Sequence, residues 1–105
     1  MPHLRFRGFD ESILEQYAPS LLPALAGVFG CPEDWISLEV VVTRYITRDA
    51  VPMVEVLWFP RDRETQDRVA KTLYEAALTW VHPAPIVVFL PVAKTDYYED
   101  GKSFG

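Results

Sequence analysis

Pro2 is the residue with the clearest capacity for chemistry, because it directly follows the initiator methionine. That methionine is normally removed before a small residue, which would leave proline as the N-terminus. The proline nitrogen would then be a secondary amine on a rigid ring. Ordinary α-amino groups titrate at about pH 7.7–8.0, and an apolar pocket lowers this pKa because burial disfavours the cation. Pro2 is therefore a candidate general base for proton transfer near neutral pH.

Two carboxylates and three arginines lie in segments that are rich in strand-forming residues. Glu39 and Glu55 stand among apolar neighbours, and a buried carboxylate must find a partner or become protonated. Arg5, Arg7 and Arg44 could provide those partners. Two interpretations stay open: structural ion pairing, or a functional acid, base or anion-binding site.

Other chemical signatures are few. Cys31 is the single cysteine, which excludes an intramolecular disulfide and a cysteine-based zinc cluster. We expect its side chain to be a small, buried or half-buried filler. His3 and His82 are too few for a metal site, and the sequence contains no phosphate-cradling glycine-rich loop. Neither a metal nor a cofactor is expected.

The composition is that of a folded chain with an acidic balance. Half of the 105 residues are hydrophobic and 13% are aromatic, so we expect a single domain over residues 1–105 with its own core. The net charge of −5 argues against a general binder of nucleic acid or anionic membranes, whose surface is basic. The N-terminus lacks an apolar signal region and no apolar run reaches membrane-spanning length, so a cytoplasmic protein is expected.

Hydrophobic periodicity predicts four strands and two helices. The strands are alternating or β-branched segments, and the helices carry apolar residues at spacings of three and four. The predicted strands are 4–6, 36–46, 53–59 and 86–90, and the predicted helices are 12–29 and 62–81.

The helix ends carry recognisable signals. Ser12 and Glu15 have the spacing of a capping box, and Asp62 is a suitable N-cap for the second helix. Pro19 and Pro23 disturb the first helix, because each removes a backbone hydrogen bond in a helix interior. Either the helix is kinked there, or it starts near Pro19 and residues 12–18 form a separate turn. His82 and Pro83 are expected to stop the second helix, and Asp100 with Gly101 predicts a turn in the tail.

The element order is β-α-β-β-α-β, with two halves of similar length. Each half has the pattern of a right-handed parallel βαβ unit. We therefore predict a two-layer α+β fold with both helices on one face of the sheet. Valines and the wholly apolar strand 86–90 suggest that both sheet faces are apolar, so another subunit must bury the face without helices. The valines concerned are Val40, Val42, Val54 and Val56.

Several segments resemble the tautomerase superfamily, which includes macrophage migration inhibitory factor and 4-oxalocrotonate tautomerase. Met-Pro-His followed by a strand matches the start of that family, and residues 30–36, Gly-Cys-Pro-Glu-Asp-Trp-Ile, resemble its Gly-Lys-Pro-Pro-Gln-Tyr-Ile stretch. Residues 2–8, 38–40, 54–59 and 66–70 are more similar to an uncharacterised bacterial branch that is known mainly as a domain of unknown function.

This resemblance implies a fold, an assembly and a site. The family forms trimers in which three sheets wrap into a barrel-like core with the helices outside. Its active sites lie at subunit boundaries around the N-terminal proline. By resemblance, Pro2 corresponds to the catalytic base, Trp35 to an aromatic pocket residue and Phe59 to an apolar pocket wall.

The sequence departs from the family at its charged positions. Cys31 stands where the Gly-Lys-Pro stretch has its cation, and Ser12 and Ser37 stand where 4-oxalocrotonate tautomerase has the arginines that bind its dicarboxylate. Carboxylate binding therefore does not transfer by position, and residues 96–100 of the tail are candidates for closing the pocket. The candidate replacements for the missing cations are Arg5, Arg7 and Arg44.

Three hypotheses for function follow. The first is a tautomerase-type enzyme in which Pro2 moves a proton on a small enol or 2-oxo acid and an arginine stabilises the enolate. The second is a non-catalytic homotrimer of the same fold that binds a ligand or a partner protein. The third is a ferredoxin-like dimer, which shares the element order but pairs its strands antiparallel.

Overall fold

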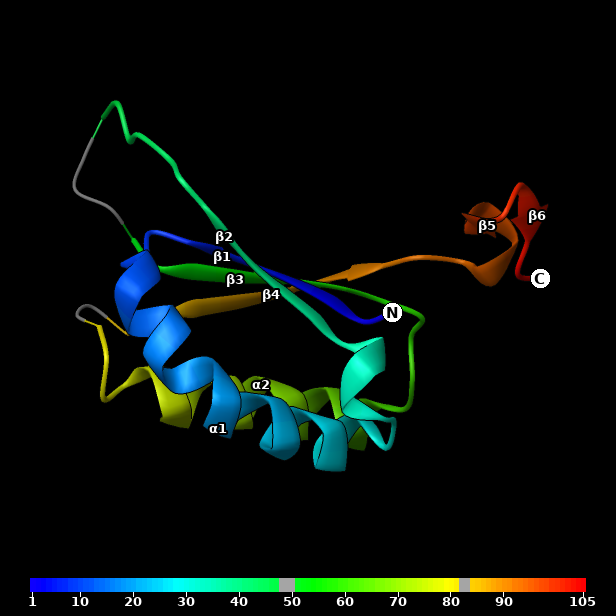
Figure 1. Ribbon diagram of the computed structural model, residues 1–105, viewed down its shortest axis with the longest axis horizontal. Helices are drawn as coiled ribbons and strands as arrows, with labels where there is room; N and C mark the ends of the chain where they lie inside the picture. The colour runs from blue at the N-terminus through cyan, green and yellow to red at the C-terminus, as the bar shows by residue number, and fades with distance from the viewer. Residues whose placement is uncertain (48–50, 82–83) are drawn as a thin grey trace.

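The structure is a computed structural model that describes residues 1–47, 51–81 and 84–105. Figure 1 shows one layer of strands above one layer of helices, with a C-terminal segment that projects beyond the sheet. The sheet strands are β1 (His3–Arg7), β2 (Ser37–Val41), β3 (Met53–Trp58) and β4 (Ile86–Pro91), and the helices are α1 (Glu11–Phe29) and α2 (Arg63–Ala77). Short 3-10 turns at Glu33–Trp35 and Lys94–Asp96 and the hairpin strands β5 (Tyr98–Glu99) and β6 (Lys102–Ser103) complete the chain.

The sheet order is β2-β1-β3-β4. β1 pairs parallel with β2 and β3 pairs parallel with β4, while β1 and β3 run antiparallel. These pairings confirm two parallel βαβ units and exclude the ferredoxin-like alternative, which needs antiparallel neighbours. One consequence matters for the site. The starts of β1 and β2 and the ends of β3 and β4 meet at one end of the sheet, which we call the Pro2 end.

The core lies between the sheet and the two helices, which lie side by side under one face (Figure 1). Alternate residues of β1 and β3 point into it, because successive side chains of a strand point to opposite faces. Leu4, Phe6, Val54, Val56 and Trp58 are buried there. They pack on the apolar stripes of α1 and α2, whose buried members are Leu14, Leu21, Leu25, Phe29, Val69, Leu73 and Ala77.

The first helix starts earlier than the capping-box spacing predicts. Asp10 is its N-cap, and the carboxylate accepts hydrogen bonds from the backbone N–H groups of Ser12 (2.9 Å) and Ile13 (3.2 Å). The helix then continues unbroken through Pro19 and Pro23. Both prolines are exposed, so the carbonyls that lose their partners lie on the water side of the helix.

Other boundaries differ by a few residues. β2 ends at Val41 instead of Ile46, and Ile46 is 80% exposed. Asp62 caps α2 as predicted, by accepting from the Thr65 N–H. Asp100 and Gly101 both have positive φ and form the predicted turn between β5 and β6. The predicted helix stop at residues 82–83 and the middle of the loop at 48–50 lie outside the described residues.

The sheet face without helices is not uniformly apolar, which corrects the sequence expectation. Val54 and Val56 face the helices, and Val42 lies beyond β2 and is 88% exposed. Strand parity puts ionic and polar residues of β1 and β2 on half of this helix-free face. Its other half, formed by β3 and β4, carries an apolar strip of Met53, Leu57, Ile86, Val88 and Leu90.

Candidate functional site

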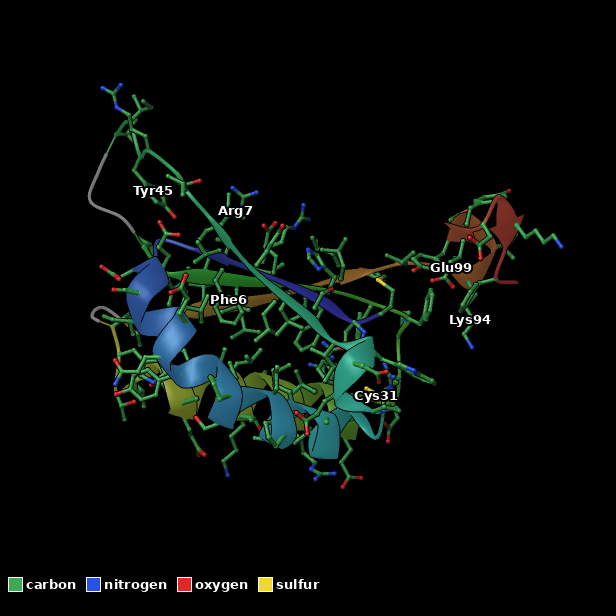
Figure 2. All side chains as sticks on the ribbon, viewed as in Figure 1. Phe6, Arg7, Cys31, Tyr45, Lys94 and Glu99 are labelled. Carbon is green, nitrogen blue, oxygen red and sulfur yellow. The ribbon has the colours of Figure 1, made fainter. Side chains whose placement is uncertain are left out.

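A cavity of about 640 Å³ lies at the Pro2 end of the sheet. The topology explains why distant segments meet there, since β1 and β2 begin and β3 and β4 end at this position. The C-terminal segment forms the remaining wall, and Figure 2 shows Lys94 and Glu99 on it. The residues that line the cavity are Met1, Asp34, Trp35, Phe59, Pro60, Arg61, Lys94, Tyr97, Glu99 and Phe104.

Pro2 is buried and follows Met1, a residue that lines this cavity. Its side chain is less than 2% exposed, and its carbonyl accepts a hydrogen bond from the Ser37 N–H at 3.2 Å, which continues the pairing of β1 with β2. Met1, to which the Pro2 nitrogen is bonded, lines the cavity. The Pro2 nitrogen is thus bonded to a residue of the cavity wall, while the Pro2 ring is buried.

Aromatic side chains form the apolar part of the wall. The Phe59 ring lies 5.2 Å from the Tyr97 ring and 5.8 Å from the Phe104 ring, and these two rings are 5.0 Å apart. Trp35 is 58% exposed on the other side. The two aromatic residues chosen from the sequence, Trp35 and Phe59, thus line the same cavity as Met1, and the tail contributes to it as expected.

The cations of the cavity are Arg61 and Lys94, which the sequence reasoning missed. It searched for cations on strands, whereas these two residues follow the ends of β3 and β4. The Arg61 guanidinium lies over the rings of Phe29 (5.5 Å) and Trp58 (5.9 Å) and donates to the Phe59 carbonyl oxygen. Strand polarity was the available signal, because it brings the residues after β3 and β4 to the start of β1.

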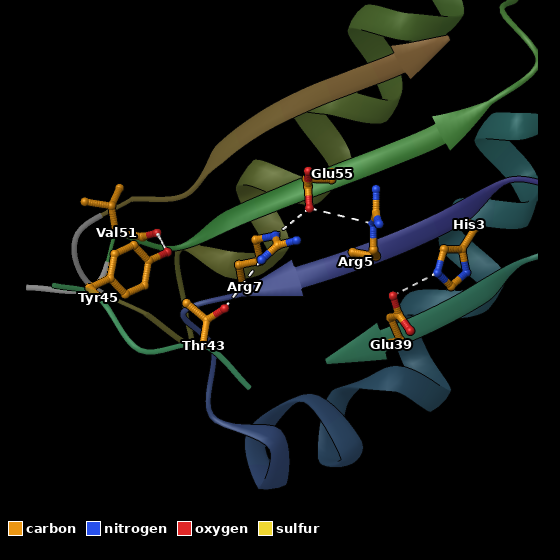
Figure 3. A network of polar contacts seen from close by, with 8 residues as sticks. All are labelled: His3, Arg5, Arg7, Glu39, Thr43, Tyr45, Val51 and Glu55. Atoms are coloured by element: carbon orange, nitrogen blue, oxygen red, sulfur yellow. Dashed lines mark hydrogen bonds and ion pairs between the residues drawn. The ribbon is translucent and has the colours of Figure 1, made fainter. Parts of the chain in front are cut away.

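The arginines predicted from the sequence lie elsewhere in the chain. Arg5 and Arg7 are on the helix-free face, and their Nε atoms lie 3.7 Å and 2.6 Å from Glu55 Oε1 (Figure 3). The Glu55 side chain is 18% exposed, so this cluster confirms the structural pairing of Glu55. Glu55 also raises the pKa of Arg7 through a hydrogen bond and its charge. Arg44 is exposed beyond β2, at the opposite end of the sheet.

Glu39 has a different partner. Its carboxylate lies 3.1 Å from Nε2 of His3 (Figure 3). Nδ1 of His3 is 2.6 Å from the Ser37 hydroxyl. The Glu39 side chain is 47% exposed, so this contact is open to solvent within one chain. The helix-free face thus carries two separate polar clusters, one around Glu55 and one around His3.

The comparisons with known proteins address the whole chain. The family model described as "Domain of unknown function (DUF1904)" matches residues 1–103. The chain belongs to the DUF1904 family. A crystal structure of a DUF1904 domain from Sebaldella termitidis is 32% identical, with a TM-score of 0.88 over 98% of this chain and 99% of that one. Among curated proteins, none matches this DUF1904 chain.

More distant solved structures carry the tautomerase fold. A fused 4-OT described as an asymmetric trimer has a TM-score of 0.80 at 14% identity, over 98% of this chain and 96% of that chain. Macrophage migration inhibitory factor of Toxoplasma gondii has a TM-score of 0.73 at 13% identity, over 97% and 99% of the two chains. The DUF1904 chain therefore has the fold of the tautomerase superfamily.

Three further observations concern the described residues. Cys31 is half-buried, and burial raises the pKa of its thiol although Arg61 and the N-terminal charge oppose the shift. Within residues 1–47, 51–81 and 84–105, no group of three or more His, Cys, Asp or Glu side chains is placed to hold a metal ion. No helix in this described part is long and apolar enough to cross a membrane.

Proposed function

We propose that this DUF1904 protein is a tautomerase-type enzyme that acts on a small enol or 2-oxo acid. Pro2, freed by removal of Met1, is its general base. The burial of Pro2 beside the cavity is the observation that carries the proposal. An amine at this wall is partly desolvated, and desolvation favours the neutral form that can accept a proton.

The reaction needs two proton transfers, one from the substrate to the amine and one from the amine back to the substrate. The neutral amine takes a proton from the carbon beside the carbonyl, the electrons of that C–H bond form the C=C bond, and the carbonyl oxygen becomes an enolate. The protonated amine then returns the proton to the enolate oxygen. Cations in the cavity stabilise the negative charge that develops on the oxygen, and Trp35 and Phe59 hold the apolar part of the substrate.

A homotrimer is part of the proposal. It is supported by the apolar strip on the helix-free face, which is partly exposed in one chain, and by the trimeric description of the fused 4-OT with the same fold. We further propose one domain over residues 1–105 and a cytoplasmic location. Arg5, Arg7 and Arg44 reach a substrate only if a neighbouring subunit brings them to the cavity, so their role in binding stays a prediction.

Activity with phenylpyruvate tests the proposed reaction. Mass spectrometry first establishes that Met1 is absent. The purified protein should then interconvert the enol and keto forms, and Pro2→Ala, which keeps an amine but loses the ring, should lower kcat by at least tenfold with an unchanged circular dichroism spectrum. Equal kcat values for the two proteins would contradict the assignment of Pro2 as base.

A second candidate function is non-catalytic ligand binding by the same cavity. This function requires no free amine, because a retained Met1 would occupy the Pro2 nitrogen through its peptide bond. If mass spectrometry finds Met1 retained on the protein made in its native host, Pro2 has no free amine and the binding function replaces the enzymatic one.

A further inference from the structure

We propose that Arg61 is the carboxylate anchor of this cavity, and that its ligand is a monocarboxylate with a flat aromatic or unsaturated body. The inference rests on the site of the proposed function but not on its chemistry. A ligand can bind through Arg61 whether or not Pro2 moves a proton.

Arg61 is fixed in place and still able to bind an anion. Its guanidinium carbon lies 5.5 Å and 5.9 Å from the ring centres of Phe29 and Trp58, and one N–H group donates to the Phe59 carbonyl oxygen at 3.3 Å. A guanidinium has five N–H donors in a fixed fork that matches a carboxylate. Among the described residues, no acidic side chain forms an ion pair with Arg61.

The contrast with three other arginines, Arg5, Arg7 and Arg63, supports this assignment. Arg5 and Arg7 both contact Glu55, and the exposed Arg63 contacts Asp67 at 3.2 Å on α2. Arg61 differs from them in two respects: it is half-buried in a cavity wall, and its charge is uncompensated by any described carboxylate within ion-pair distance.

The charged side chains that line the cavity indicate which ligand charge is favoured. They include two cations, Arg61 and Lys94, and two carboxylates, Asp34 and Glu99. One carboxylate placed on Arg61 is stabilised by a charge-assisted hydrogen bond. Apart from Arg61, the lining has two carboxylates, Asp34 and Glu99, and one cation, Lys94. A second carboxylate therefore meets a net negative charge, and a dicarboxylate is disfavoured.

The aromatic lining of the cavity indicates the chemical class of the non-carboxylate part of the ligand. Phe59, Tyr97 and Phe104 form an aromatic cluster on one side, and Trp35 presents a largely exposed ring. Flat rings next to one another favour stacking with a planar ligand. Lys94, whose Nζ lies 5.7 Å from the Phe59 ring centre, adds a second positive charge at this wall.

Isothermal titration calorimetry with three probes tests the proposal. The probes are trans-cinnamate, the neutral trans-cinnamamide and the dianion of 4-carboxycinnamic acid. Wild type should bind cinnamate at least tenfold more tightly than either other probe. Arg61→Gln should weaken cinnamate binding by roughly tenfold to a hundredfold, which corresponds to loss of a charged hydrogen bond, and should leave cinnamamide binding unchanged.

Matched variants make the result specific. Arg63→Gln, two residues away and exposed, should bind cinnamate like wild type, and Arg61→Lys should retain part of the affinity because it keeps the charge. A wild-type protein that binds cinnamate but does not convert phenylpyruvate would count only against the proposed reaction. Absence of cinnamate binding to wild type, equal binding by a folded Arg61→Gln variant, or tighter binding of the dianion would each overturn the inference.

Discussion

Two regions of the molecule each contain a pair of cationic side chains, and the two pairs have different partners. On the helix-free face, Arg5 and Arg7 share the carboxylate of Glu55. At the cavity, Arg61 and Lys94 form no ion pair with any described carboxylate and lie over aromatic rings instead. Strand position decides the difference, because residues within strands face cross-strand partners, whereas residues just after the strands face the cavity.

The largest expected effect is on assembly through the helix-free face. Val88→Asp puts an unpaired carboxylate into the apolar strip, which costs several kcal/mol if another subunit covers it. The variant should sediment as a monomer. Val42→Asp is the matched control: it makes the same change at a position that is 88% exposed, and its assembly should equal that of wild type. A folded wild-type monomer at micromolar concentration would remove the trimer from the proposal.

A smaller effect is expected within the ionic cluster of the same face. Glu55→Gln leaves Arg5 and Arg7 without their carboxylate, and the variant should melt roughly 5–10 °C lower than wild type. Glu39→Gln is the control, because its carboxylate is 47% exposed and meets only His3; its melting temperature should change by less than about 3 °C. Equal shifts in both variants would show that the Glu55 cluster has no special structural role.

The smallest effect is expected at Cys31, because the pKa of its thiol responds to the positive charge of Arg61. Burial raises the pKa of this thiol and the positive charge of Arg61 lowers it, so at pH 8 the thiolate is scarce and iodoacetamide should react more slowly than with a cysteine peptide. Arg61→Gln removes the opposing charge, raises the pKa further and should slow alkylation by roughly twofold. Arg63→Gln should leave the rate unchanged. Faster alkylation of Arg61→Gln would contradict the claim that the charge of Arg61 lowers the pKa of Cys31.

Much of the fold could be predicted because its signals are local. Periodicity identified both helices and all four sheet strands. The order of elements favoured parallel βαβ units, but it left open the ferredoxin-like alternative, which the strand pairing excludes. The end of β2 could not be predicted, because the β-branched run continues past Val41 while the pairing with β1 stops at Arg7. Because the predicted strand extended to Ile46, the prediction also placed Val42 in the sheet.

The site could be predicted only in part. Pro2 was chosen for its chemistry and Trp35 and Phe59 by resemblance, and the structure places all three at one end of the sheet. Arg61 carried no sequence signal of its own, since an arginine after a strand is usually a solvated loop residue. Its position matters only once strand directions bring the end of β3 to the start of β1.

The pKa of the Pro2 nitrogen is the most direct test of the account. The measurement is an NMR titration of that nitrogen in protein shown by mass spectrometry to lack Met1. Because the Pro2 ring is buried and Arg61 of the cavity adds a like charge, the neutral amine is favoured, and the pKa should fall below that of an ordinary α-amino group. A pKa at or above that of a model peptide with N-terminal proline would contradict the assignment of Pro2 as a base, and ligand binding without catalysis would become the leading function.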